Sequence, residues 1–381
     1  MTRRRTLALA LTLVFVVTLC VAYHLDRAEV LVMEDAGGLA VTVGAKKTYD
    51  EFVRAAQMDP LYPVGIPHIR PFYVSEEKMP RYYKYRERLL TPVMNQEICA
   101  SCWAISVCHV ISDRISLLTG GKIMRPLSHQ ELISCFNVQG DHGCTRGASP
   151  EYAYRYIAEK GIATDTDYPY VQGNTTRISP CKATRLKEGG LRTYILNDSI
   201  KSLCEDPYQH ALGSPEYRSV LEQNMRSMKT EIFLNGPICV TVQVYKSLYD
   251  FDGLSIYEGP GEDDEYVGGH AAVCFGFAEE INGEEPGFDG DFWFVKNSWS
   301  SSWPTRSPSS NGFFYIRAGK NVCGIESRAS SAQPVITAEI RANMTSTIRD
   351  SAYLSYGDYV ADPSRNNYIT KSTKLRTMLK K

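Results

Sequence analysis

The feature that most constrains this chain is a polar stretch, Asn95–Ala104, which leads directly into an apolar segment. The apolar residues from Ile105 to Ile115 roughly follow helical spacing, which predicts that Cys102 lies in the first turn of a helix. The N–H groups of a first turn and the positive end of the helix dipole favour a thiolate, the form of cysteine that attacks carbonyl carbons. Taken alone, a cysteine such as Cys102 is more often buried or disulfide-bonded, so a catalytic role requires suitable partner residues elsewhere in the sequence.

Two later segments supply groups that could serve such a thiol. Of the seven histidines, His270 follows two glycines that permit close backbone approach, and it opens an apolar strand. Asn297 follows another apolar run, and its amide oxygen could accept the imidazole N–H and fix the orientation of the ring. Trp299 could shield that hydrogen bond from water. A buried structural histidine, a turn asparagine and a core tryptophan are the alternatives, which the joint occurrence of the three segments disfavours.

Together these segments resemble the active-site motifs of papain-like cysteine peptidases. Cys99–Trp103 resembles Cys-Gly-Ser-Cys-Trp with alanine at position 100, and Gly268–Ala271 and Lys296–Trp299 resemble Gly-Gly-His-Ala and Lys-Asn-Ser-Trp. The resemblance implies that Cys102 is the nucleophile, His270 the general base and Asn297 its orienting partner. It also implies that Gln96, with the Cys102 backbone N–H, binds the oxyanion, and that Trp299 supports the site.

The order of elements predicts an α+β fold, because helical patterns come first and strand patterns follow. Ser128 and Glu131 form a potential capping box that begins a short helix. The family resemblance implies two lobes, a helical lobe and a β-barrel-like lobe, with the active site in the cleft between them. The other expected helices are Glu151–Lys160 and Ser219–Asn235, and the expected strands are Ile238–Val244, His270–Phe277, Phe292–Lys296 and Phe313–Arg317.

Several phrases resemble the cathepsin B-like subgroup of this family, for example Cys323–Ser327. The spacing from Cys102 to His270 also exceeds the roughly 130–150 residues of short papain-like domains, largely through the segment Asn197–Tyr217. The paired histidines of that subgroup's occluding loop are absent after Gly147, so we expect an endopeptidase rather than a carboxydipeptidase.

The resemblance also suggests residues that bind substrate. Gly147 and Gly269 would line the cleft. Arg146 replaces a cleft glycine, and Arg328 falls where the family sets the floor of the main specificity pocket. These two arginines suggest a preference for an acidic residue two positions before the scissile bond. The alternative is that both point to solvent.

The eleven cysteines favour disulfides in an oxidising compartment, since no zinc-type spacing is present and we expect neither metal nor cofactor. The resemblance implies the pairs Cys99–Cys144 and Cys135–Cys181. Cys323 lacks an obvious partner, and a group in apolar runs is expected to be buried thiols: Cys108, Cys239 and Cys274. Three N-x-Ser/Thr sequons begin at Asn174, Asn197 and Asn343.

The chain is expected to have four parts. Residues 1–23 carry three arginines and then an uncharged apolar run, which fits either an uncleaved signal anchor or a cleaved signal peptide. Residues 24–78 would be a pro-segment or a stalk, residues 79–337 the peptidase domain, and residues 338–381 a basic, flexible tail. A single-pass membrane protein with a lumenal or extracellular domain is expected, or else a secreted or lysosome-like one.

The net charge of −1 gives no reason to expect nucleic acid, so the expected partners are a polypeptide substrate and, if the anchor is retained, the membrane. We expect a monomer. The main alternative to a peptidase is a catalytically inactive papain-like binding or adhesion module. A third possibility, a cysteine-rich structural ectodomain, has no need of Gln96 or the tryptophans.

Overall fold

The computed structural model describes residues 31–33, 41–43, 79–136, 142–182, 191–279, 290–304, 311–345 and 353–354. The expected signal segment, and most of the expected pro-segment and tail, lie outside the described residues. Within 24–78 there is one short antiparallel pair, β1 (Leu31–Met33) and β2 (Val41–Val43). None of the described helices has both the length and the apolar character that crossing a membrane requires.

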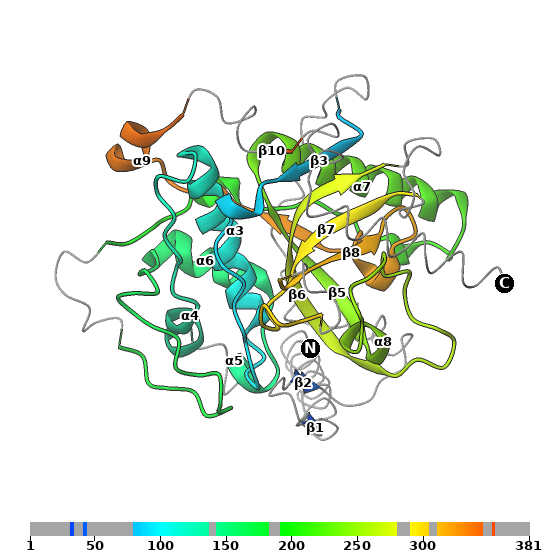
Figure 1. Ribbon diagram of the computed structural model, residues 1–381, viewed down its shortest axis with the longest axis horizontal. Coiled ribbons are helices and arrows are strands. Elements are labelled where there is room, and N and C mark those ends of the chain that lie inside the picture. The colour runs from blue at the N-terminus through cyan, green and yellow to red at the C-terminus, as the bar shows by residue number, and fades with distance from the viewer. Residues whose placement is uncertain are drawn as a thin grey trace, which may run out of the picture.

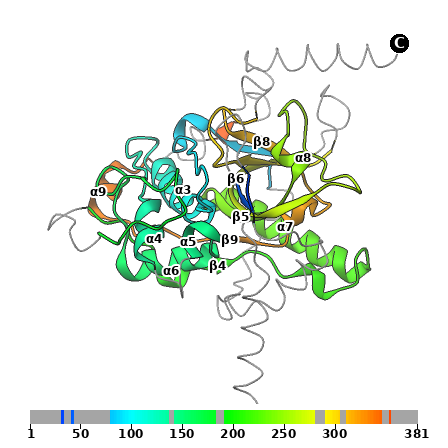
Figure 2. The ribbon, with the colours of Figure 1, turned by 90° about the horizontal axis from the view of Figure 1, so that it is seen from below.

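Helices α3 to α6 gather on one side of the molecule, and the strands lie on the other side together with α7 and α8, as Figures 1 and 2 show from two directions. The helical lobe is built around α3 (Cys102–Leu118), which is buried over almost its whole length. α4 (His129–Cys135) and α6 (Pro150–Lys160) pack against α3, and the short α5 (His142–Thr145) lies beside α4. α6 ends at Gly161 as expected, because its φ of 67° is a left-handed conformation that glycine adopts without strain.

The other lobe is an eight-stranded antiparallel sheet centred on β6 (Tyr266–Ala278), which pairs with β5 on one side and β7 on the other. Because side chains alternate along a strand, β6 contributes to two cores. Ala271 and Val273 belong to the core shared with α3, whereas Ala272 and Cys274 belong to the core of the sheet lobe. The other strands are β3 (Tyr82–Tyr85), β4 (Lys201–Ser202), β5 (Ile238–Tyr245), β7 (Phe292–Lys296), β8 (Phe313–Arg317), β9 (Ala329–Ser331) and β10 (Tyr353–Leu354).

The helix α7 (Pro215–Asn235) packs against β5 and β6. It begins with Pro215 behind the cap Ser214, whose side chain accepts a hydrogen bond from the Tyr217 N–H at 3.1 Å. The remaining short helices are η2 (Glu87–Leu89), η4 (Asn197–Ser199), η5 (Pro207–Gln209), α8 (Lys246–Tyr249), η6 (Val322–Gly324) and α9 (Ala338–Asn343).

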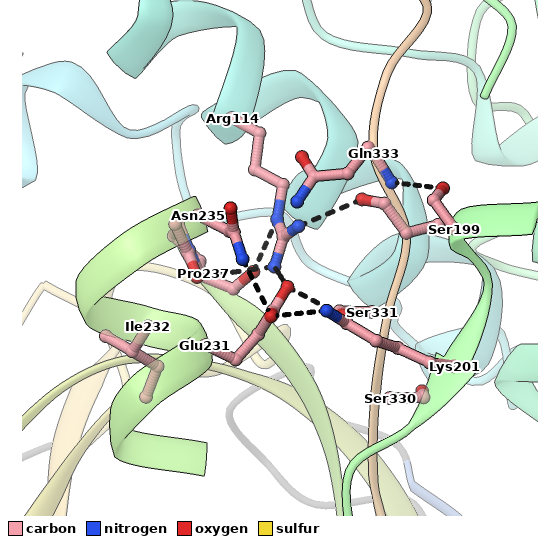
Figure 3. Close-up of polar contacts among 12 residues, drawn as sticks. Arg114, Ser199, Lys201, Glu231, Ile232, Asn235, Pro237, Ser330, Ser331 and Gln333 are labelled. Carbon is pink, nitrogen blue, oxygen red and sulfur yellow. Dashed lines mark hydrogen bonds and ion pairs between the residues drawn. The ribbon is translucent and has the colours of Figure 1, made fainter. Parts of the chain in front are cut away.

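A buried charged cluster ties α3 to the sheet lobe (Figure 3). Arg114 Nη2 lies 2.9 Å from Glu231 Oε1 on α7, and Lys201 Nζ lies 2.7 Å from Glu231 Oε2. The carbonyl oxygens of Pro237 and Ala332 accept further guanidinium N–H groups at 3.0 and 3.1 Å. Arg114 and Glu231 are both 1% exposed, so their charges are matched within the protein rather than by water.

The α+β organisation and the bounds of β7 and β8 agree with the sequence-based expectations. Three details differ. α7 begins at Pro215 rather than residue 219, and β6 begins at Tyr266, so His270 lies inside the strand rather than at its head. The capping box is only half formed: Ser128 Oγ accepts from the Glu131 N–H at 3.0 Å, but the Glu131 carboxylate instead accepts from the Ala163 N–H at 2.9 Å.

Candidate active site

Cys102 is the first residue of α3, as its sequence context predicts. The loop before it is folded back on itself, since the Cys99 N–H donates to the Gln96 carbonyl at 3.3 Å and the Ala100 N–H donates to the Cys144 carbonyl at 2.7 Å. A disulfide between Cys99 and Cys144 fastens the same loop. These contacts hold the thiol at the mouth of the helix, where it is 8% exposed.

The Cys102 thiol also contacts the strand that carries His270. Burial raises the pKa of Cys102, and backbone hydrogen bonds from Ala271, Trp103 and Cys102 itself oppose that rise without cancelling it. Cys102 and Ala271 belong to the same buried core, so the first turn of α3 packs against the strand that carries His270. The N–H groups of the first helical turn lower the pKa of Cys102, in the direction that its sequence context predicts, but burial raises this pKa by more.

His270 is paired with Asn297. The ring Nε2 lies 2.7 Å from Asn297 Oδ1, which also accepts the Ser298 N–H at 2.8 Å. Because a carbonyl oxygen can only accept, Nε2 carries the hydrogen and Nδ1 is left as the proton acceptor. Burial lowers the pKa of His270 to about 4, and the hydrogen bond to Asn297 opposes that change. The imidazole is therefore neutral near pH 7.

Trp299 covers the His270–Asn297 pair. Its ring centroid lies 4.7 Å from that of His270, and the side chain is 1% exposed. Trp303 and Tyr249 pack on Trp299 in turn, with centroids at 5.0 and 5.8 Å. This aromatic layer keeps water from the imidazole–amide hydrogen bond and so strengthens it.

Gln96 lies between the two lobes. Its backbone N–H donates to the Ser298 carbonyl at 2.9 Å, and its side-chain Oε1 accepts from Ser298 Oγ at 2.8 Å. The Cys99 carbonyl, which can only accept, fixes which end of the amide is which, because Nε2 donates to it over a long 3.3 Å. An Nε2 group has two hydrogens, and one weak bond leaves donor capacity beside Cys102.

A buried ion pair lies directly behind the site. Lys296 Nζ, one residue before Asn297, lies 2.6 Å from Asp113 Oδ2 on α3, and both side chains are 0% exposed. The other carboxylate oxygen accepts the N–H and the hydroxyl of Thr91 at 2.6 and 2.7 Å. This pair connects the helix of Cys102 to the strand that leads to Asn297.

The residues expected to bind substrate lie around the same region. Gly147 has a φ of 68°, and a Cβ there would lie 3.2 Å from the Ala100 carbonyl, so glycine is required close to the Cys102 loop. Arg146 beside it is exposed, and Gly269 next to His270 is also exposed. Arg328 is half-buried, and its charge acts on Glu151 and Tyr266.

Both disulfides implied by the family resemblance are present, Cys99–Cys144 and Cys135–Cys181. The free cysteines within the described ranges are all buried: Cys102, Cys108, Cys204, Cys239, Cys274 and Cys323. In the described part of the chain no cluster of three His, Cys, Asp or Glu side chains is arranged to hold a metal.

Sequence reasoning missed three residues that support this site. Ser298, Asp113 and Tyr170 hold Gln96, Lys296 and the Cys102 loop in place. Ser298 lies within the Lys-Asn-Ser-Trp segment, so its position was a usable signal. Asp113 and Tyr170 act across the fold, and nothing in their local sequence indicates their partners.

A model of the papain family of cysteine proteases matches residues 79–333. The chain belongs to this family. A gut-specific cysteine proteinase of Caenorhabditis elegans is 30% identical over 239 residues, which cover 62% of this chain and 66% of the relative. Cathepsin B-like cysteine proteinase 3 of the same organism is 29% identical over 271 residues, covering 66% of this chain and 65% of the relative. The chain thus spans slightly less than two thirds of these relatives.

A solved structure of procathepsin B S9 from Trypanosoma congolense superimposes with a TM-score of 0.52 at 24% identity, covering 71% of this chain and 83% of that one. This similarity confirms the papain-like α+β fold. The expected resemblance to cathepsin B-like proteins is confirmed as well, since several of the relatives carry that description.

Proposed function

We propose that this papain-family protein is a cysteine endopeptidase in which Cys102 is the nucleophile and His270 the general base. The observation that carries the proposal is the convergence of three groups from two lobes. Cys102 at the start of α3 contacts the backbone of Ala271, and the neighbouring His270 is held at 2.7 Å by Asn297. A nucleophile, a base and an orienting group on neighbouring elements are the set of groups that acyl transfer through a thiol requires.

The reaction uses the Cys102 thiol and the His270 imidazole as a nucleophile–base pair. Cys102 Sγ bonds to the substrate carbonyl carbon while its proton passes to His270, and the carbonyl oxygen becomes an oxyanion. Collapse of this intermediate breaks the C–N bond, and the departing amine takes the proton from His270. Water then attacks the thioester, gives a proton to His270, and releases the carboxylic acid and the Cys102 thiol.

The oxyanion would be bound by Gln96 Nε2 and the Cys102 backbone N–H. Ser298 and the Cys99 carbonyl together hold the Gln96 amide, so the donor is in place before substrate arrives. Loss of one such donor typically lowers the rate by about 10²–10³.

We further propose that Arg328, with the exposed Arg146, favours substrates with an acidic residue two positions before the scissile bond. The half-buried position of Arg328 supports this, because a partly desolvated guanidinium gains more from a carboxylate than a fully solvated one does. Matched peptides with Glu or Arg at that position test the idea. We expect the Glu peptide to be cleaved faster and the preference to fall in Arg328→Gln; equal cleavage of the two peptides would contradict it.

A lumenal or extracellular location, with residues 1–23 as an anchor or a cleaved signal, is part of the proposal. It is supported by the two disulfides, which persist in oxidising compartments. Sequencing the N-terminus of the protein made in a secretory host distinguishes anchor from cleaved signal.

Labelling with a thiol-directed peptidyl epoxide tests the central proposal, with Cys102→Ala as the control. We expect rapid labelling of the processed protein that disappears in the control. A folded, processed protein that is not labelled would indicate the inactive binding module instead.

A further inference from the structure

The hydroxyl group of Tyr170 lies against the loop that carries both proposed oxyanion donors. It donates to the Gln96 carbonyl at 2.8 Å and lies 3.3 Å from Ser101 Oγ. Gln96 carries the side-chain donor, and Ser101 directly precedes Cys102, which carries the backbone donor. One phenol therefore spans the two ends of the loop that forms the oxyanion site.

Tyr170 is itself held in place by contacts with α4. Its ring centroid lies 4.4 Å from that of His129 at the start of α4. On its C-terminal side, the Val171 N–H donates to Gln130 Oε1 at 2.9 Å. Burial raises the pKa of Tyr170 to about 12, so the hydroxyl remains a neutral donor at every pH at which a peptidase works. These contacts make Tyr170 a fixed point relative to the Cys102 loop.

Gln96 is thus held from both lobes. Ser298 in the sheet lobe bonds its N–H and its side-chain oxygen, and Tyr170 in the helical lobe bonds its carbonyl oxygen. Without the Tyr170 hydroxyl, Gln96 keeps only two long bonds of 3.3 Å to the Cys102 loop, from the Cys99 N–H to its carbonyl and from its Nε2 to the Cys99 carbonyl, so Nε2 can shift away from Cys102. With the bonds to both Tyr170 and Ser298, the distance from Nε2 to the reacting carbonyl is set.

We propose that Tyr170 is a positioning residue for the oxyanion site, acting through Gln96. The inference rests on the proposed peptidase function. It predicts that the hydroxyl matters for steps that develop an oxyanion and not for steps that only need an activated thiol. Opening of an epoxide by Cys102 is a step of the second kind, because no carbonyl oxygen gains charge.

The test compares Tyr170→Phe with the parent protein in two reactions. In peptide amide hydrolysis we expect kcat to fall roughly 10-fold with KM changed less than about two-fold, a smaller loss than the 10²–10³ for a missing donor because Gln96 is still present. The rate of epoxide alkylation at Cys102 should stay within about two-fold, since no carbonyl oxygen gains charge in that step and the epoxide oxygen takes its proton from His270. The phenyl ring keeps the packing against His129, and the alkylation rate reports that the site is folded.

Two further variants make the test specific. Tyr156→Phe removes a phenol that donates to Glu131 at 2.9 Å elsewhere in the helical lobe, so it should leave both reactions unchanged. In a Gln96→Ala background, Tyr170→Phe should cause no further loss of kcat, because the group it positions is gone.

The inference is overturned if Tyr170→Phe lowers amide hydrolysis and epoxide alkylation equally, or if its effect persists in the Gln96→Ala background. It is also overturned if Tyr170→Phe hydrolyses the peptide as fast as the parent. A parent protein that neither hydrolyses peptides nor reacts with the epoxide refutes the proposed function itself, and that result is distinct from the others.

Discussion

Replacing Asp113 by asparagine should destabilise the protein more than any surface change, because the residue neutralises a fully buried lysine. Asp113 Oδ2 lies 2.6 Å from Lys296 Nζ, and Oδ1 accepts both the N–H and the hydroxyl of Thr91. Asparagine has the same shape but only one acceptor oxygen. Whichever way its amide turns, the NH₂ group faces a donor, either the Lys296 ammonium or Thr91.

The magnitude follows from the burial of both partners. Both side chains are 0% exposed, and removing one member of such a pair typically costs about 3–5 kcal/mol. Lys296 keeps two weaker acceptors, the Thr91 carbonyl at 3.2 Å and hydroxyl at 3.1 Å, so we expect the lower half of that range. Native domains are stable by about 5–15 kcal/mol, so the loss is a large fraction of the total.

Urea unfolding without reductant measures this loss, in a Cys102→Ala background that prevents self-digestion. All four tryptophans are at most 1% exposed, so their fluorescence reports loss of the fold. Burial lowers the pKa of Lys296, and Asp113 opposes that effect. Without Asp113 the native state holds this proton less tightly than the unfolded state does, so the stability of Asp113→Asn should rise with pH more steeply than that of the parent.

Asp113→Asn/Lys296→Met is the decisive control, because it removes the unpaired charge. The double variant should be more stable than Asp113→Asn alone, with a remaining loss of about 1–3 kcal/mol for the unpaired amide. A single variant that loses less than about 1 kcal/mol, or a double variant that is less stable than the single one, would refute the reasoning.

Three other expectations concern ionisation and helix capping. Asn297→Ala should lower the pKa of His270 further, because the lost hydrogen bond raises it, and the acid limb of epoxide inactivation should move to lower pH; an upward shift would contradict this. Burial holds the pKa of His270 at about 4, that of His129 at about 3 and that of His109 well below 6.5. The unfolded chain therefore binds more protons, and stability should fall as the pH drops from about 6.5 to 4. Urea midpoints that stay constant over that interval would count against it. Ser128→Ala should cost about 1 kcal/mol through loss of the α4 cap, as thermal unfolding in the same background would show; an unchanged midpoint would argue that the cap contributes nothing.

The sequence was most informative where structure depends on neighbours along the chain. The start of α3 at Cys102, and the bounds of β7 and β8, follow from local apolar spacing. β6 begins earlier than expected because Tyr266 and the glycines after it pair with β5, and that pairing is a property of the sheet rather than of the segment. The start of α7 was missed although Ser214 and Pro215 are a standard helix signal.

The same difference between local and long-range features applies to the candidate active site. The four residues proposed to form the active site, Cys102, His270, Asn297 and Gln96, lie in short recognisable segments, so sequence alone could identify them. The ionisation of Cys102 could not be predicted this way. The helix terminus is a local feature that favours the thiolate, whereas the burial that raises the pKa comes from packing of the sheet lobe against α3. The roles of Tyr170 and Asp113 could not be predicted from the sequence either, because their hydrogen-bond and ion-pair partners lie on distant segments.

The buried charged cluster around Arg114 affects how the chain folds during synthesis as well as how the folded protein is held together. Its guanidinium needs Glu231 on α7 and the carbonyl of Ala332, which is 218 positions further along. A nascent chain that has finished the helical lobe still holds Arg114 without these partners, and burying it then is unfavourable. The helical lobe therefore cannot reach its final packing until β9 and the residue after it have been made. A truncation before Ala332, or an attempt to express either lobe alone, should yield a protein that fails to mature.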